Sequence, residues 1–129
     1  MRTHFLKDLH IPGKEKALMV LPGFDFYRFR KVNRLAVEGH EDISSADLIL
    51  TAEYVDEAPG KKAVVTVRFG GARLIRLPEM SPLFCLSELE IEDVSDDQLE
   101  GVAYRTKDYG SGEFEVLSRQ LEIIECVLR

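Results

Sequence analysis

Residues 62–77, which read KAVVTVRFGGARLIRL, decide the fold that this sequence predicts. Residues 64–69 and 72–77 are rich in β-branched and other apolar side chains, and Gly70 and Gly71 separate the two runs. Glycine adopts the positive φ angles of two-residue hairpin turns without strain. We therefore expect an antiparallel hairpin that reverses direction at the two glycines.

A two-residue turn would fix the register of this hairpin and the composition of its two faces. It would place Arg68 directly opposite Arg73, which is an unfavourable like-charge pair. Either an anion binds there, the two side chains extend into water, or carboxylates of a neighbouring strand balance them. Arg68 and Arg73 are therefore candidates for binding an anion or a small ligand. The other face should belong to the core, and its members are Val65, Val67, Phe69, Ala72 and Leu74.

The rest of the chain continues the two-residue alternation that is typical of half-buried strands. We expect strands over residues 47–56, 87–94, 101–109 and 113–117, with a compact hairpin turn at residues 110–112. Residues 24–37 also fit a strand, residues 118–129 fit a strand better than a helix, and residues 14–21 fit either a short strand or one helical turn. The predicted fold is mainly β: an antiparallel meander of seven to eight strands that forms a sandwich or partly open barrel, with at most one or two short helices.

Length and composition indicate one globular domain. The chain has 129 residues, of which 45% are hydrophobic and 31% are charged, and this size supports a real core without disulfides or metals. We expect a single domain over residues 1–129, in which a less regular segment, 1–45, packs on an antiparallel β core, 46–129.

The cysteines and the first residues bear on the cellular compartment. Residues 1–10 contain no long apolar run, and the run from Ala17 to Leu21 is too short to span a bilayer. We expect a cytoplasmic protein with reduced thiols at Cys85 and Cys126. Cys85 lies in the apolar run 83–86, so we expect it to be buried.

Charge is unevenly distributed. The formal net charge is −6, with eight Lys or Arg against three Asp or Glu in residues 1–34 and nine against twenty in residues 35–129. An acidic protein does not favour general nucleic-acid binding, because phosphate neutralisation supplies most of that affinity. It favours a basic protein partner or solubility alone.

The densest acidic stretch begins within the expected strand at residues 87–94 and continues past its end. Alternation would place its three glutamates in a row on the outer face, and two aspartates continue the charge into the next turn. If residues 101–109 pair with this strand, Arg105 and Lys107 would balance much of the row. The partner-binding candidates are Glu88, Glu90, Glu92, Asp96 and Asp97.

No motif for a nucleotide, a metal or a catalytic nucleophile is present, so we assign no catalytic residue, cofactor or metal. One alternative is a small-ligand-binding or enzymatic β-barrel. Its candidate residues are Arg68, Arg73, Tyr104 and His40. A further alternative is a single-stranded nucleic-acid binder that uses the aromatic and basic residues Phe26, Tyr27, Arg28, Phe29 and Arg30. The competing interpretation is that these aromatic side chains pack in the core.

The favoured function is a non-enzymatic binding domain whose acidic surface engages a basic protein. In fold and charge alone, such a domain resembles small inhibitor and immunity proteins that cover a basic enzyme site. We expect no nucleic-acid or membrane partner, and the sequence leaves a homo-oligomer open.

Overall fold

The computed structural model describes residues 9–39, 46–56, 61–78, 84–97 and 101–129. It contains seven antiparallel strands in one open sheet, which confirms the predicted mainly β class. The strands are β1 (Phe29–Gly39), β2 (Ala46–Val55), β3 (Lys62–Arg76), β4 (Leu89–Asp93), β5 (Tyr104–Asp108), β6 (Glu115–Ser118) and β7 (Gln120–Leu128). The helical elements are α1 (Lys14–Val20) and the 3-10 turns η2 (Phe26–Arg28) and η3 (Ser95–Asp97).

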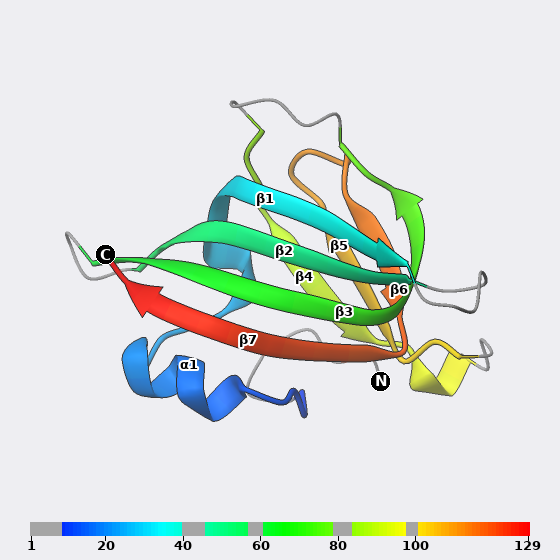
Figure 1. Ribbon diagram of the computed structural model, residues 1–129, viewed down its shortest axis with the longest axis horizontal. Helices are drawn as coiled ribbons and strands as arrows, with labels where there is room; N and C mark the ends of the chain where they lie inside the picture. The colour runs from blue at the N-terminus through cyan, green and yellow to red at the C-terminus, as the bar shows by residue number, and fades with distance from the viewer. Residues whose placement is uncertain (1–8, 40–45, 57–60, 79–83, 98–100) are drawn as a thin grey trace.

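The sheet folds over on itself into two layers. Its order is β1-β2-β3-β6-β5-β4, and β7 also pairs with β3. The first layer comprises β1, β2, β7 and residues 62–70 of β3, and the second comprises β4, β5, β6 and residues 73–76 of β3. Figure 1 shows the second layer behind the first, with its strands running steeply across those in front, and α1 beneath β7. The hydrophobic core lies between the layers.

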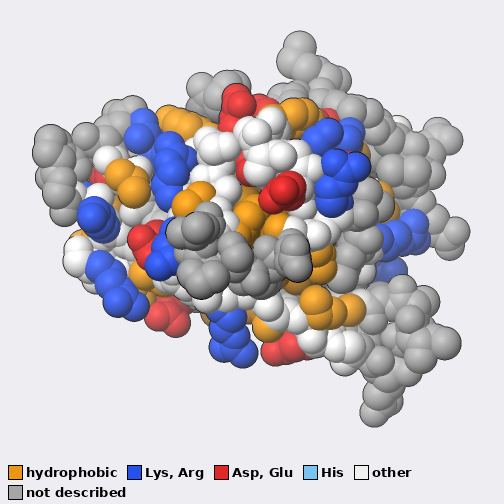
Figure 2. All heavy atoms as spheres, turned by 90° about the horizontal axis from the view of Figure 1, so that it is seen from above, with side chains coloured by type: hydrophobic (Ala, Val, Ile, Leu, Met, Phe, Trp, Pro, Cys, Tyr) orange, Lys and Arg blue, Asp and Glu red, His pale blue; other side chains and the backbone are white. Residues whose placement is uncertain are grey.

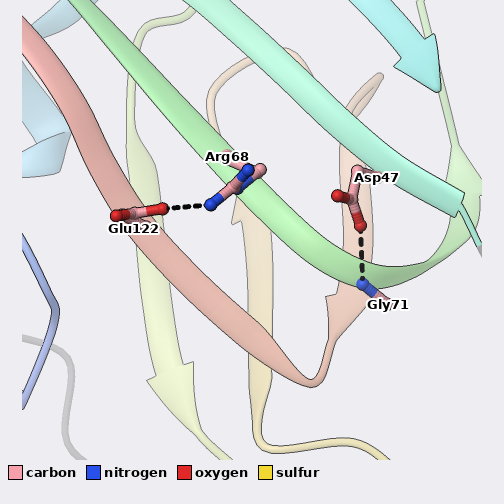
Figure 3. Close-up of polar contacts among 4 residues, drawn as sticks. All are labelled: Asp47, Arg68, Gly71 and Glu122. Atoms are coloured by element: carbon pink, nitrogen blue, oxygen red, sulfur yellow. Dashed lines mark hydrogen bonds and ion pairs between the residues drawn. The ribbon is translucent and has the colours of Figure 1, made fainter.

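The hairpin predicted at Gly70 and Gly71 is wrong, because β3 continues through both glycines. Gly71 has φ +58°, but Gly70 does not have the positive φ that a type I′ or II′ turn needs at its first central position. The register with β2 shifts by one residue here, so the glycines form a β-bulge that bends the strand. The Gly71 amide donates to Asp47 Oδ1 at 3.2 Å (Figure 3).

A second segment follows β3 around this bend. β6 and β7 both run antiparallel to β3, and only Arg119 separates them. The Arg119 amide donates to the Gly70 carbonyl at 3.0 Å. The two segments therefore form one long bent ribbon, and the bend carries the chain from the first layer to the second.

Aromatic residues near the N-terminus fill one end of the core. Phe24 stacks on Tyr54 with ring centroids 5.0 Å apart, and Phe26 and Phe29 pack edge-on in the same cluster. The Tyr54 hydroxyl donates to the Gly23 carbonyl and accepts from the Asp25 amide. Burial raises the pKa of Tyr54 to about 12. This cluster confirms the core interpretation of the aromatic segment.

Burial confirms four of the five residues of the predicted core face, and the side chain of the fifth, Leu74, lies outside what the structure describes. The buried residues include Leu48, Leu50, Ala52 and Tyr54 of β2 and Val65, Val67, Phe69 and Ala72 of β3. Residues 120–128 form a strand, as favoured, and residues 14–20 form a helix. Cys85 is exposed, so its predicted burial is wrong. Its neighbours Phe84 and Leu86 point into the core, and the alternation of an extended chain turns Cys85 outward.

Candidate interaction surface

A groove of about 370 Å³ lies between η2 and the beginning of β4. One wall comes from the start of the aromatic segment and the other from β4 and the residues before it. The lining residues are Asp25, Tyr27, Arg30, Ser87, Glu88, Leu89 and Glu90. The lining therefore includes three acidic residues and one basic residue, Arg30. It includes two of the five predicted partner-binding residues.

Glu88 is held in the groove by its backbone. Its amide donates to Oδ1 of the buried Asp108 at 2.7 Å, and its carbonyl accepts from the Tyr109 amide at 3.0 Å. The same Asp108 carboxylate accepts from the Ser87 amide and from the amide and hydroxyl of Ser111. Asp108 therefore ties the start of β4 to the turn between β5 and β6, and the Glu88 side chain projects from a fixed backbone into solvent.

The opposite wall presents a tyrosine and a fixed cation. Tyr27 is 40% exposed, and the Arg28 guanidinium lies 5.0 Å from its ring centroid. Nη1 of Arg30 donates to the carbonyls of Tyr27 and Phe29, both at 2.8 Å. Tyr27 therefore offers an aromatic surface beside the acidic residues, and its ring already holds the Arg28 cation.

The predicted exposed row of three glutamates is wrong at its far end. Glu88 is exposed and Glu90 is half-buried, but Glu92 retains only 5% exposure. The Tyr109 hydroxyl donates to Glu92 Oε1 at 3.0 Å, and the Lys107 ammonium lies 5.0 Å from the Tyr109 ring centroid. Glu92 is therefore buried and hydrogen-bonded, and it does not belong to the accessible surface.

The pairing of β4 with β5 confirms the expected charge balance. Glu90 lies opposite Lys107, and Glu92 lies opposite Arg105. Arg105 Nε also donates to Glu115 Oε2 at 2.9 Å on the next strand. Acidic and basic side chains therefore alternate across three strands, and part of the glutamate row serves the sheet itself.

The two aspartates that continue the row lie beyond β4. Asp96 is exposed in η3, and the Asp97 side chain lies outside the described residues. Asp93, just before them, accepts from the hydroxyl and amide of Ser95, and these bonds lower the pKa of the Asp93 carboxyl.

The ligand-binding candidates do not converge. Arg68 pairs with Glu122 of β7 at 2.5 Å on the outer face of the first layer (Figure 3), and it lies opposite Ile49 and Glu122 instead of Arg73. Arg73 belongs to the other side of the bend, where it faces Leu117 of β6. The Tyr104 hydroxyl donates to the His10 carbonyl. His40 lies outside the described residues.

The five candidates for stacking on single-stranded nucleic acid do not form a platform. Phe26 and Phe29 are buried in the aromatic cluster, so of the three aromatic residues only Tyr27 has an exposed ring. Arg30 is bound to backbone carbonyls.

Sequence reasoning missed the contributions of Asp25 and Asp108 to this surface. It also considered Tyr27 only as a base-stacking residue and not as a residue of the groove. Asp25 precedes η2 and accepts from the Phe26 amide, which is a capping signal visible in the sequence. Asp108 comes just before the glycine-rich turn, where aspartate commonly accepts from the following backbone. No sequence signal brings residues 25–30 beside residues 87–90.

The acidic net charge is not displayed evenly. Figure 2 looks at the molecule from above the view of Figure 1, and there Lys and Arg side chains gather on two sides of exposed hydrophobic atoms while Asp and Glu are scattered. Among the described residues, no three His, Cys, Asp or Glu side chains are placed to hold a metal ion. In the same part of the chain, no helix has the length and apolar character needed to cross a membrane.

An open antiparallel sheet folded over one core, with a groove between η2 and the start of β4, defines a small β-sheet domain. Its chain belongs to the family of immunity protein PIM8, whose model matches residues 24–123. The match begins in the aromatic cluster, ends within β7 and includes every residue that lines the groove. Comparison with curated proteins and with solved structures gave no match.

Proposed function

We propose that this protein is an immunity protein that neutralises a toxin by binding it. The observation that carries the proposal is the family match over residues 24–123. A binding role needs no catalytic group in the immunity protein, because a bound partner that covers the active site of a toxin excludes its substrate. The free thiols of Cys85 and Cys126 fit a reducing compartment, and we propose the cytoplasm as the site of action.

We propose that the groove between η2 and β4 receives a basic segment of the toxin. Glu88 is exposed on a backbone fixed by Asp108, and Asp25 and Glu90 add acidic charge around it. Charged groups across an interface accelerate association and select the partner, even where their net contribution to affinity is small. Tyr27 supplies an aromatic surface beside these carboxylates, and tyrosine is enriched among residues that dominate binding energy.

The experiment combines inhibition with one pair of matched variants. A toxin that binds this protein, sought first among the products of neighbouring genes, is titrated with wild type, with Glu88→Gln and with Glu125→Gln, an exposed glutamate on β7 in the first layer. We expect wild type to abolish toxin activity at about one equivalent. Glu88→Gln should lower affinity by about 3- to 30-fold and flatten its salt dependence, whereas Glu125→Gln should leave both unchanged.

Two results would contradict these proposals separately. Full toxin activity in the presence of excess wild-type protein would refute the immunity function. Inhibition that Glu88→Gln and Glu125→Gln affect equally would retain that function and refute the groove as its contact surface.

A further inference from the structure

Among the residues that the structure describes, none pairs with the outer side of residues 33–39 of β1. β1 is the last strand on its side of the sheet, and within the described residues only its first part has an outer neighbour, through the bridge between Lys31 and Cys85. From Arg34 to Gly39 every residue is in register with β2. This stretch contains no proline or lysine, which are common protections against pairing at an edge.

The side chains along this edge would complement those of a second, antiparallel copy of the same edge. An antiparallel pair of β1 strands related by a two-fold axis at Ala36 would place Arg34 opposite Glu38 of the second copy, and Leu35 opposite Val37. Both charged residues are exposed, and neither has a hydrogen-bond or ion-pair partner within the described part of the chain. Opposite charges at directly facing positions stabilise an antiparallel pair.

Two features of the single copy become favourable in that arrangement. Val37 faces the core side of the sheet opposite the buried Leu48, yet it is 51% exposed, and Leu35 of a second copy would cover it. Glu38 lies directly opposite Asp47, which is a like-charge pair. Arg34 of a second copy would lie on the other side of Glu38 and offset this repulsion.

We propose that the protein forms a two-fold symmetric homodimer through antiparallel pairing of β1 with β1, with Ala36 on the symmetry axis. The first layers of the two copies then form one continuous sheet. The interface is a single edge of seven residues in each copy, so the dimer is weak and dissociates in the micromolar range. This inference concerns the protein without its toxin and does not rest on the proposed function.

The test is sedimentation equilibrium of the full chain from about 1 μM to about 1 mM. Wild type should dimerise, and Arg34→Glu or Glu38→Arg alone should weaken dimerisation by about tenfold, because each places like charges opposite one another twice. The double variant Arg34→Glu/Glu38→Arg should recover to within about threefold of wild type, since it restores opposite charges. Circular dichroism of each variant verifies the fold.

A cross-link locates the axis independently. In a Cys85→Ser/Cys126→Ser background, Ala36→Cys should form a disulfide dimer on oxidation, because facing residues of paired strands have Cα atoms about 4.5 to 5.5 Å apart, within reach of a disulfide. Thr51→Cys, on the same face of β2, is the control and should stay monomeric. The proposal would be overturned if the protein is a monomer at every concentration or if the double variant dimerises no better than the single variants. It would also be overturned if the Thr51→Cys control cross-links as well as Ala36→Cys, or if the edge pairs only with toxin.

Discussion

The residue just before β4, Glu88, and a residue near the end of β4, Glu92, show how one alternating sequence produces two different environments. Glu88 and Glu92 lie on the same face and differ in position by four residues. Glu88 lines an open groove, whereas Glu92 is buried, accepts a hydrogen bond from Tyr109 and lies opposite Arg105. Alternation therefore identifies the face of a strand that a residue occupies. How deeply that residue is buried depends on which side chains of other segments pack over the face.

The largest expected effect comes from removing the anchor of the Glu88 end. Asp108→Ala leaves the amides of Ser87, Glu88 and Ser111 without their acceptor and should lower the free energy of unfolding by about 3 kcal/mol or more. Urea unfolding measures the change. Asp96→Ala, an exposed aspartate, is the control and should stay within about 0.5 kcal/mol of wild type. Equal losses for the two variants would mean that Asp108 does not organise this end.

Substitution of Glu92 should change the free energy of unfolding and leave toxin affinity unchanged. Glu92→Ala removes the acceptor of the Tyr109 hydroxyl and a carboxylate opposite Arg105, and it should cost about 1 to 3 kcal/mol of unfolding free energy. Tyr109→Phe should add little to Glu92→Ala in the double variant, because the two share one hydrogen bond. Toxin affinity, measured by calorimetry, should be that of wild type, and a large loss would place Glu92 in the interface.

Glu88 should give the opposite result. Its side chain has no partner within the described residues, so Glu88→Gln should change the free energy of unfolding by less than about 0.5 kcal/mol. Thermal denaturation of the same preparations used for toxin binding measures this. Marked destabilisation without loss of affinity would reverse the roles assigned to the two ends.

The smallest effect concerns Asp93, just past Glu92. Its pKa is lowered from 3.8 by the hydroxyl and then the amide of Ser95, so the folded state favours the charged carboxylate. That contribution is present above pH 3.8 and is lost as the pH falls through the lower folded value. Ser95→Ala should reduce the acid dependence of stability below about pH 4, and only slightly, because water screens an exposed group. An unchanged acid dependence would mean that the Ser95 hydroxyl does not hold this carboxylate.

Local patterns predicted much of the sheet. The buried faces of β2 and β3 follow from two-residue alternation, and the choice of a strand for residues 120–128 follows from their β-branched composition. The sequence left the pairing of β4 with β5 open, and the structure establishes it. These are interactions of neighbouring strands, and the periodicity of one strand reports which face it buries. The turn after β5 is equally local, because Asp108 accepts from the Ser111 amide three residues later, although the connection runs from Tyr109 to Phe114 instead of over residues 110–112 alone.

The glycine pair at the centre of β3 misled prediction for a physical reason. Gly70 and Gly71 both allow positive φ, but hairpin turns and β-bulges both use glycine, so the glycine pair alone does not distinguish a chain reversal from a bulge. Asp47 of β2 and Arg119 between β6 and β7 bind the backbone at the bend, and both are distant in sequence. The groove was missed for the same reason, because its walls are about sixty residues apart along the chain.

The groove is tested most directly by backbone amide chemical shifts of the isotope-labelled protein during titration with the toxin. The account predicts that the largest changes fall at Tyr27, Glu88 and Glu90, and that Glu92 and the outer face of β7 change little. Changes confined to the outer face of the first layer, with the amides of residues 25–30 and 87–90 unmoved, would contradict it.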